Sequence, residues 1–298
     1  MNEKAVQKEG AVAESRGEGQ SAQPHGCESR VPAPQLRPYI TAYRFFDLDA
    51  SVSYTVPAWT RTMMLFRYGD FFYAYFPDGT AVPHLGASLF GTTTRPLAYG
   101  GSSGRYRFVA VEFRLPAFCM AVGEGAGAFT DRVVEAGAIY GDGLMGLIVE
   151  QLCEARTIEA RCTALDRFFA SQLKNLEVSL RPELAEALTR LTEGREPLTM
   201  DRLIALSEMP ERTLRRRFKE ITGLSPQLYQ SIRRVERALG HIYHNPRAPA
   251  ADIVAACGFS DQPHLIRELR RFALATPREL RRNQGAGPGP LKDFFSPR

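Results

Sequence analysis

Apolar residues along the chain follow two different periods, and the change between them divides the sequence. From about residue 34 to residue 113, short runs rich in aromatic and β-branched residues alternate with Pro and Gly breaks. Such runs occupy residues 39–45, 62–68, 71–76 and 105–113. This pattern predicts a small all-β sheet or barrel.

After Pro116 the apolar spacing lengthens toward the helical period, so we expect helices to follow the sheet. A further amphipathic stretch starts at Arg181-Pro182 and ends at Gly194, and no strand is predicted from there to about Asn283. The fold class expected is α+β with two domains, a small β-sheet or barrel domain followed by helices and an all-α domain.

Residues 1–32 contain almost no large apolar side chain and are predicted to be a disordered arm. The β-rich domain is expected over residues 33–178, a linker helix over 179–195, the all-α domain over 196–283 and a flexible Gly- and Pro-rich tail over 284–298.

An internal duplication occupies the last third of the chain. Residues 199–209 align with residues 249–259 at an offset of 50. Further along, the offset is 51, and it pairs Leu214, Phe218, Ile221 and Pro226 with Leu265, Leu269, Phe272 and Pro277. Each copy has the pattern of a short helix, a tight turn and a longer helix, which predicts two helix-turn-helix motifs.

In the first copy, the second helix is predicted over residues 211–222, followed by Gly223 as a left-handed cap. Its apolar stripe leaves Arg212, Arg215, Arg216 and Lys219 on other faces. Positive side chains early in a helix oppose its dipole, so an external anion is expected to compensate. Phosphates or a guanine edge would serve, whereas the alternative is a solvated surface of a helix bundle.

The net charge of +5 is concentrated in this region of the chain. Residues 195–283 hold 17 Lys and Arg against 10 Asp and Glu, a local excess of +7 that leaves −2 elsewhere. This asymmetry favours a polyanionic partner, although a solvated basic face would look similar.

Five cysteines without Cys-x-x-Cys spacing indicate neither a disulfide framework nor a zinc knuckle, and we expect reduced, mostly buried thiols. No apolar run approaches the ~18 residues of a membrane span, and the start does not resemble a signal peptide. We therefore expect a cytoplasmic protein without a membrane partner or cofactor.

Residues 196–282 resemble the DNA-binding domain of AraC/XylS-type bacterial transcription regulators. In that family, a seven-helix unit holds two helix-turn-helix motifs joined by a long helix. Residues 209–226 match the first motif, residues 251–262 match the opening of the second, and residues 234–238 stand at the connecting helix.

The resemblance implies a sequence-specific transcription regulator that docks two recognition helices in successive major-groove segments, ~34 Å apart. The implied base-reading residues are Arg212, Arg215, Arg216, Gln262, His264 and Arg267. The implied phosphate contacts are Thr213, Lys219, Ser225 and Arg270. The implied partners are double-stranded promoter DNA and RNA polymerase, and the implied location is the nucleoid within the cytoplasm.

Departures from the family pattern concentrate in the second copy. Leu269 stands where an aromatic residue is usual, and Leu274 replaces the capping glycine that matches Gly223. That helix end must close differently or with strain. Gly240 interrupts the connecting helix. The second copy is therefore expected to be the weaker base reader.

Residues 35 to about 175 more loosely resemble an uncharacterised N-terminal domain of some family members, which implies a sensing or dimerising role. An aromatic cluster there is a candidate lining for an apolar effector pocket, and its alternative is plain core. Its members are Tyr54, Trp59, Phe66, Phe72, Tyr73 and Tyr75. A small-molecule effector and a homodimer are thus candidate partners.

Few residues support metal or redox chemistry. His84 is the only histidine of the β-rich domain, and His241 with His244 lacks a third ligand. Cys119, Cys153 and Cys162 are either a redox switch or structural thiols.

Two rivals to a ligand-responsive regulator stay open. One is a ligand-independent DNA-binding or interaction protein. The other is a DNA-repair methyl-acceptor, an enzyme that uses the same helical module but needs a metal-held cysteine. We expect no enzyme and, of the regulators, an activator.

Overall fold

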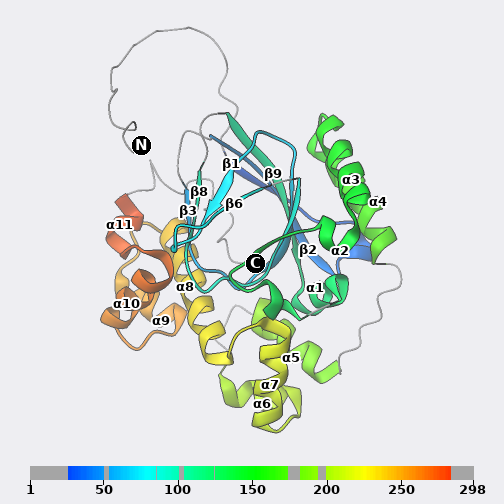
Figure 1. Cartoon of the computed structure of the whole chain (residues 1–298). Coiled ribbons are helices and arrows are strands. Elements are labelled where there is room, and N and C mark those ends of the chain that lie inside the picture. The colour runs from blue at the N-terminus through cyan, green and yellow to red at the C-terminus, as the bar shows by residue number, and fades with distance from the viewer. Residues whose placement is uncertain are drawn as a thin grey trace, which may run out of the picture.

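The structure is a computed structural model, and it places a β-rich front domain against a helical rear domain (Figure 1). It describes residues 26–49, 54–84, 86–100, 104–123, 125–173, 182–193 and 199–282.

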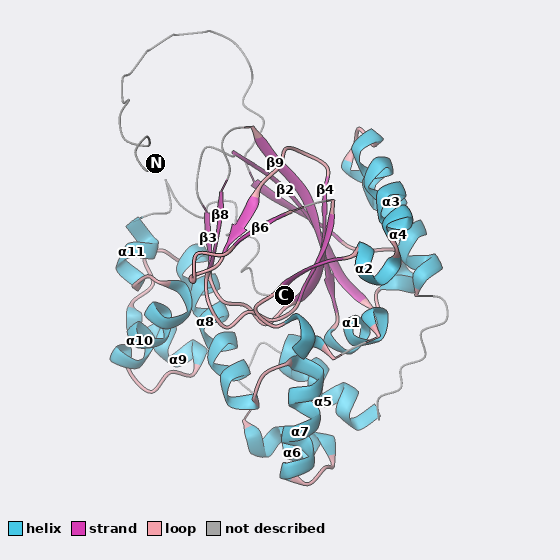
Figure 2. Cartoon of the chain, viewed as in Figure 1, coloured by secondary structure: helices cyan, strands magenta, loops and turns pink. Residues whose placement is uncertain are grey.

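Two antiparallel sheets form the front domain (Figure 2). The larger has the strand order β1-β2-β9-β4-β7-β10. Its strands are β1 (Gly26–Arg30), β2 (Ile40–Asp49), β4 (Thr62–Arg67), β7 (Ala87–Phe90), β9 (Arg105–Phe113) and β10 (Val133–Glu135). The smaller sheet has the order β3-β8-β5-β6. Its strands are β3 (Tyr54–Val56), β5 (Tyr73–Tyr75), β6 (Ala81–Pro83) and β8 (Leu97–Gly100).

Strand β1 corrects the expectation of a disordered arm up to residue 32. It pairs antiparallel with β2 over its whole length, from Gly26 opposite Asp47 to Arg30 opposite Tyr43. An edge strand is held by main-chain hydrogen bonds, so it forms without the large apolar side chains on which the expectation rested. Residues 1–25 and the tail 284–298 lie outside the described residues.

Helices cover the outer face of the larger sheet. The helical elements of the front domain are η1 (Pro34–Leu36), α1 (Leu115–Val122), η2 (Ala126–Phe129), α2 (Gly137–Tyr140), α3 (Asp142–Glu154) and α4 (Ile158–Gln172). Phe66 of β4 meets Phe168 and Phe169 of α4 edge-on, at ring-centroid distances of 6.0 and 6.2 Å. Because side chains alternate along a strand, Met63 and Leu65 then face the smaller sheet.

Seven helices form the rear domain within the described residues, as the fold class anticipated. They are α5 (Pro182–Glu193), α6 (Met200–Ser207), α7 (Glu211–Thr222), α8 (Pro226–His244), α9 (Ala250–Cys257), α10 (Gln262–Ala273) and α11 (Pro277–Arg282). Helix α5 packs on α6 and buries Leu184, Leu188 and Leu191. The stretch expected as a linker therefore supplies one of the seven helices.

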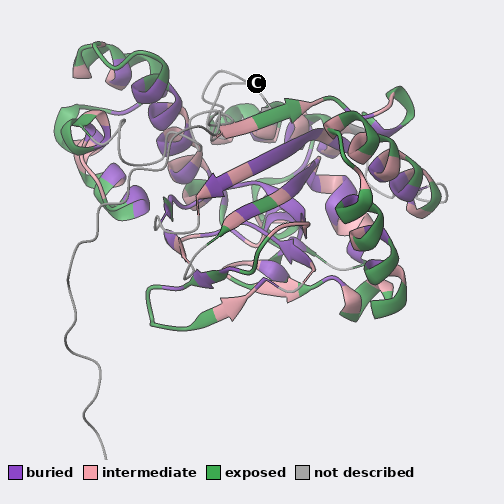
Figure 3. Ribbon diagram, turned by 90° about the horizontal axis from the view of Figure 1, so that it is seen from above, coloured by how far each residue is buried: buried purple, intermediate pink, exposed green. Residues whose placement is uncertain are grey.

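Burial follows this layering. Figure 3 shows buried residues along the strands, while the outer faces of the covering helices are exposed. In the part of the chain that the structure describes, no helix has the length and hydropathy of a membrane span.

Candidate nucleic-acid interface

Helices α6 and α7 form the first predicted helix-turn-helix motif. Thr199 begins α6 by accepting a hydrogen bond from the Arg202 amide at 3.3 Å. The predicted apolar stripe of α7, which includes Leu214 and Phe218, is buried, and the Phe218 ring meets Tyr229 of α8 edge-on at 5.4 Å. The stripe thus fixes which face of α7 points away from the core.

Basic side chains occupy the outward face of α7. Arg212, Arg216 and Lys219 are exposed, and Arg215 is half-buried. The side chain of Arg216 keeps 59% of its surface open to solvent. All four predicted DNA contacts are therefore accessible to a ligand.

Two glutamates that the sequence analysis did not select hold these arginines. Glu211 binds Arg215 at 2.6 Å, and Glu220 binds Arg216 at 2.7 Å and Arg217 at 3.3 Å. The i,i+4 spacing of opposite charges was the signal available for finding them. These carboxylates orient the guanidinium groups along the helix and compete with phosphate for them.

Helices α9 and α10 form the second motif, and its turn organises His264. The Asp261 side chain accepts the His264 amide at 2.6 Å, which begins α10 and holds the pKa of Asp261 below its usual value. The ring Nδ1 of His264 accepts the Ser260 amide at 3.3 Å. A neutral ring then carries its proton on Nε2, a donor suited to a purine N7 or O6.

The remaining predicted contacts lie in mixed surroundings. Gln262, Arg267 and Arg270 are exposed on α10, and Thr213 is half-buried on α7. Ser225 is exposed, yet its oxygen accepts the Leu228 amide at 3.3 Å and so begins α8. The Ser225 hydroxyl thus has a structural task besides its predicted one.

The two copies of the repeat have left-handed residues at equivalent positions, but the glycine of one copy is matched by a non-glycine residue in the other. After the first helix, the left-handed residue is Glu208 in one copy (φ 52°) and Gly258 in the other (φ 75°). After the recognition helix it is Gly223 (φ 78°) and Leu274 (φ 54°). The expected strain at Leu274 is present, because a side chain in this region costs ~1–2 kcal/mol.

The front domain contacts the C-terminal end of each recognition helix. At α7, the Thr92 hydroxyl donates to the Thr222 carbonyl at 3.1 Å, and the Cys119 thiol donates to the Ile221 carbonyl at 3.3 Å. At α10, the Ala58 amide donates to the Phe272 carbonyl at 2.8 Å. The predicted base-reading positions toward the start of each helix stay clear of these contacts.

A buried ion network joins the front domain to α8. Both oxygens of Glu236 accept from Thr60, the amide at 3.0 Å and the hydroxyl at 2.9 Å, and Arg233 binds the carboxylate at 2.8 Å. Burial by itself raises the pKa of Glu236, but Arg233, Arg61 and the Thr60 amide outweigh it and lower the pKa. Arg61 also binds Glu112 of β9 at 2.5 Å.

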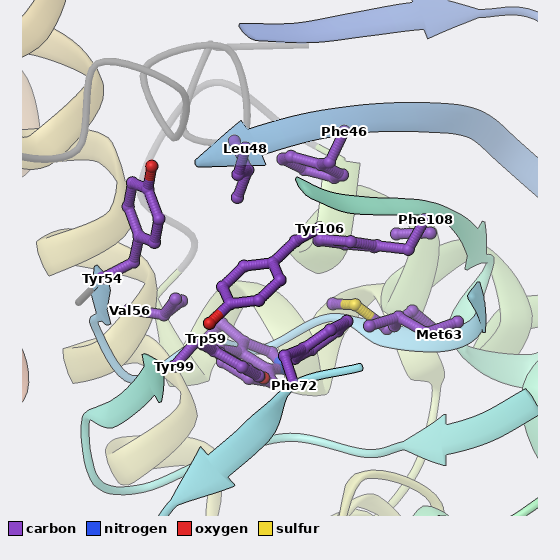
Figure 4. Close-up of a pocket in the computed structure, with 12 residues that line it drawn as sticks. Phe46, Leu48, Tyr54, Val56, Trp59, Met63, Phe72, Tyr99, Tyr106 and Phe108 are labelled. Carbon is purple, nitrogen blue, oxygen red and sulfur yellow. The ribbon is translucent and has the colours of Figure 1, made fainter. Parts of the chain in front are cut away.

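An apolar cavity of about 50 Å³ lies between the two sheets (Figure 4). It is lined by Phe46, Leu48, Tyr54, Val56, Trp59, Met63, Leu65, Phe72, Tyr99, Tyr106, Phe108 and Ala110. Figure 4 shows the Tyr106 ring extending from β9 toward Trp59 and Tyr99. The cavity lies in the region of the predicted effector pocket.

Half of the predicted pocket residues line this cavity. Tyr54, Trp59 and Phe72 do, whereas Phe66 packs under α4 on the other face of the sheet. Tyr73 and Tyr75 are exposed on the outside of β5, because both alternate with the buried Ala74. Alternation along β2 and β9 was the signal for five of the nine missed lining residues, which are Phe46 and Leu48 on β2 and Tyr106, Phe108 and Ala110 on β9.

Cysteines and histidines give little support to the catalytic rival. Burial raises the pKa of Cys119, Cys162 and Cys257 to about 11, which keeps these thiols protonated at neutral pH. Only Cys257 of the five cysteines is fully buried, and Cys153 is exposed, so the expectation of mostly buried thiols is corrected. The described residues contain no group of three potential ligands that could hold a metal ion.

Comparison with known proteins matches residues 204–283 to the family described as a helix-turn-helix domain. The HTH-type transcriptional activator RhaS of Escherichia coli strain K12 / DH10B is 38% identical over 73 residues, 24% of this chain and 26% of RhaS. RhaS of E. coli O1:K1 / APEC matches to the same extent. The chain thus spans about a quarter of the length of these relatives.

Among solved structures, ToxT from Vibrio cholerae aligns with 80% of this chain and 97% of its own, at 8% identity and a TM-score of 0.47. Another ToxT structure, from strain O395, aligns with 82% of this chain and 98% of its own, at 9% identity and the same TM-score of 0.47. The family match spans helices α7 to α11, so this part of the rear domain is similar to a helix-turn-helix domain.

Proposed function

We propose that this chain is a sequence-specific DNA-binding transcription regulator. The observation that carries the proposal is the pair of recognition helices, α7 and α10, each packed on its apolar stripe with basic residues turned outward. A row of outward arginines suits the acceptor edges and phosphates of a major groove.

Residues divide by role along each helix. Arg212, Arg215 and Arg216 of α7 and Gln262, His264 and Arg267 of α10 read bases. Thr213, Lys219, Ser225 and Arg270 hold phosphates and set the register. Because every described contact to the front domain is made at the C-terminal ends, DNA can approach the base-reading halves without displacing that domain.

The front domain acts in this proposal as a sensor, with the apolar cavity as effector site. Activation at promoters, with RNA polymerase as partner, is proposed by analogy with the transcriptional activator RhaS. A homodimer would place four recognition helices on one operator, and the location is the cytoplasm. The rival is a regulator that binds DNA without any ligand.

Selection of binding sites from random duplexes by the full chain tests the DNA-binding proposal. We expect two short conserved blocks about one helical turn apart, from the two recognition helices. The double variant Arg212→Ala with Arg216→Ala should lose one block and keep the other. Enrichment of no sequence by the folded chain would refute sequence-specific recognition.

A further inference from the structure

The apolar cavity is lined by twelve side chains, none of which carries a charge (Figure 4). We propose that it binds a small uncharged molecule with an apolar body, and that Trp59 and its chain neighbours relay occupancy to both helix-turn-helix motifs. This inference rests on the proposed sensing function of the front domain and specifies the ligand class and the route of its effect.

The chemistry of the lining excludes a charged ligand. A carboxylate or ammonium buried among these side chains would have no counter-ion, at a cost of several kcal/mol. The polar groups of the lining are the hydroxyls of Tyr54, Tyr99 and Tyr106 and the indole N–H of Trp59, which donates to the Gly91 carbonyl. Burial raises the pKa of Tyr106 to about 12, so its hydroxyl stays protonated and can orient one polar atom of a neutral ligand.

The cavity is smaller than a one-ring ligand, so binding of such a ligand must move the protein. The cavity of about 50 Å³ exceeds the ~10–15 Å³ that one water molecule needs, but an apolar cavity that holds benzene measures ~150 Å³. A ligand with one ring must therefore push lining side chains outward. Displacement of a lining side chain can affect the rear domain where that residue or its neighbours hydrogen-bond to it.

Trp59 is such a residue, and its own hydrogen-bond partners flank the residue that contacts α7. Its indole Nε1 donates to the Gly91 carbonyl at 3.0 Å, and its amide donates to the Thr93 hydroxyl at 3.0 Å. The Thr93 amide in turn donates to the Trp59 carbonyl at 2.8 Å. Thr92, between these two partners, holds the Thr222 carbonyl at the end of α7.

The chain neighbours of Trp59 lead to the other half of the rear domain. Ala58 donates its amide to the Phe272 carbonyl at the end of α10. Thr60 donates both its amide and its hydroxyl to Glu236 of α8. A shift of Trp59 by a ligand therefore reaches α8 and α10 through its chain neighbours Thr60 and Ala58, and it reaches α7 through Thr92, which lies between its hydrogen-bond partners.

Ligand binding can be measured directly, because Trp59 is the only tryptophan of the chain. We expect bromobenzene to quench the Trp59 fluorescence of the full chain saturably through its heavy atom. The matched anion 4-bromobenzoate should leave it unchanged at equal concentration. Equal quenching by both probes, or quenching by neither, would overturn the ligand class.

Filling the cavity provides the next test. Ala110→Leu adds bulk at a lining position of β9, and we expect it to raise the bromobenzene concentration for half-quenching at least tenfold. Ala110→Val is the smaller substitution should the leucine variant fail to fold by circular dichroism. Unchanged quenching in either folded variant would place the probe outside the cavity.

Hydrogen exchange of the full chain tests the relay. In the wild type, bromobenzene should change the exchange of amides in α7, α8 and α10 as well as in the front domain. Thr60→Val removes one bond to Glu236, and Thr92→Val removes the bond to α7. We expect Thr60→Val to weaken the response of α8 and Thr92→Val to weaken the response of α7.

Thr62→Val is the matched control, since Thr62 is buried nearby but its hydroxyl donates to Phe113 within the front domain, at 3.5 Å. It should leave the response intact. Exchange changes confined to the front domain, or weakened equally by all three variants, would overturn the relay. Neither readout uses DNA, so a failure of DNA binding and a failure of this inference are told apart.

Discussion

Ile221 and Phe272 occupy the same position in the two copies of the repeat, and the carbonyl oxygen of each accepts a hydrogen bond from the front domain. The donors are the Cys119 thiol at 3.3 Å and the Ala58 amide at 2.8 Å. Carbonyls in the last turn of a helix lack partners within it, so the front domain satisfies groups that the fold leaves open. It thereby fixes α7 and α10 at their C-terminal ends, away from the predicted base-reading residues.

Arg216 and Lys219 should differ in what their loss does to DNA binding. Arg216→Ala is expected to relax base preference at one position of the operator, by ~1–3 kcal/mol. Lys219→Ala should weaken all duplexes alike and lower the salt slope by about one. Titrations of matched and mismatched duplexes at several salt concentrations measure both effects. Identical behaviour of the two variants would contradict the division into readers and phosphate contacts.

Glu220 should limit unspecific binding, because it pairs with Arg216 and Arg217 on the outward face of α7. Glu220→Gln frees both guanidinium groups for phosphates. We expect severalfold tighter binding to random duplexes and a smaller preference for the operator, measured by fluorescence anisotropy.

The control for Glu220 is Glu150→Gln, which makes the same change of net charge at an exposed position of α3. This variant should behave as the wild type does. If both variants tightened random binding equally, total charge rather than the pairing on α7 would be responsible.

Leu274→Gly should stabilise the folded chain by roughly 0.5–1 kcal/mol. The left-handed φ of 54° strains a leucine and not a glycine, although glycine also increases the entropy of the unfolded chain. Chemical unfolding followed by circular dichroism gives the free energy. Glu208→Gly, at the left-handed bend of the first copy, should act in the same direction. A loss of stability in both would show that these bends carry no strain.

His84 should make the folded state sensitive to acid. Burial, with a smaller effect of Arg67, lowers the pKa of His84 to about 3, whereas an unfolded histidine titrates near ~6.5. Between these values only the unfolded chain binds the proton. The contribution of neutral, buried His84 to the free energy of unfolding is complete above pH ~6.5. It is lost as the pH falls, by up to ~1.4 kcal/mol per pH unit.

Unfolding free energies of wild type and His84→Leu at pH 7, 6 and 5 check this expectation. The variant should show a shallower decline over that range, whatever its stability at pH 7. His241→Leu, an exposed position at the end of α8, should keep the wild-type slope. Parallel slopes for all three proteins would mean that His84 titrates normally in the fold.

Sequence patterns predicted most of the rear domain, because the same apolar spacing occurs in both copies of the repeat. The stripe of Leu214 and Phe218 and its repeat at Leu265 and Leu269 set which faces are buried, and the structure confirms all four as core. The outward basic residues follow from the same periodicity. The strained bend at Leu274 was foreseen for the same reason, since its partner is a glycine.

Contacts between the domains could not be predicted in this way. Periodicity describes one element at a time, so nothing in it connects Thr60 with Glu236 or Ala58 with Phe272. Only half of the predicted pocket residues line the cavity, for a related reason. The density of aromatic residues identified the region, but the strand face on which each ring lies decides whether it lines the cavity. Phe66 lies in the aromatic-rich region, but its side chain points to the other face of the sheet and packs against α4.

Gly127 of η2 lies against Gly223, where an added β-carbon on Gly127 would stand 3.2 Å from the Gly223 Cα atom. Bare backbones thus meet at the seam between the front domain and α7, while α10 is held elsewhere through Ala58. A single methyl group at residue 127 would loosen one motif and spare the other.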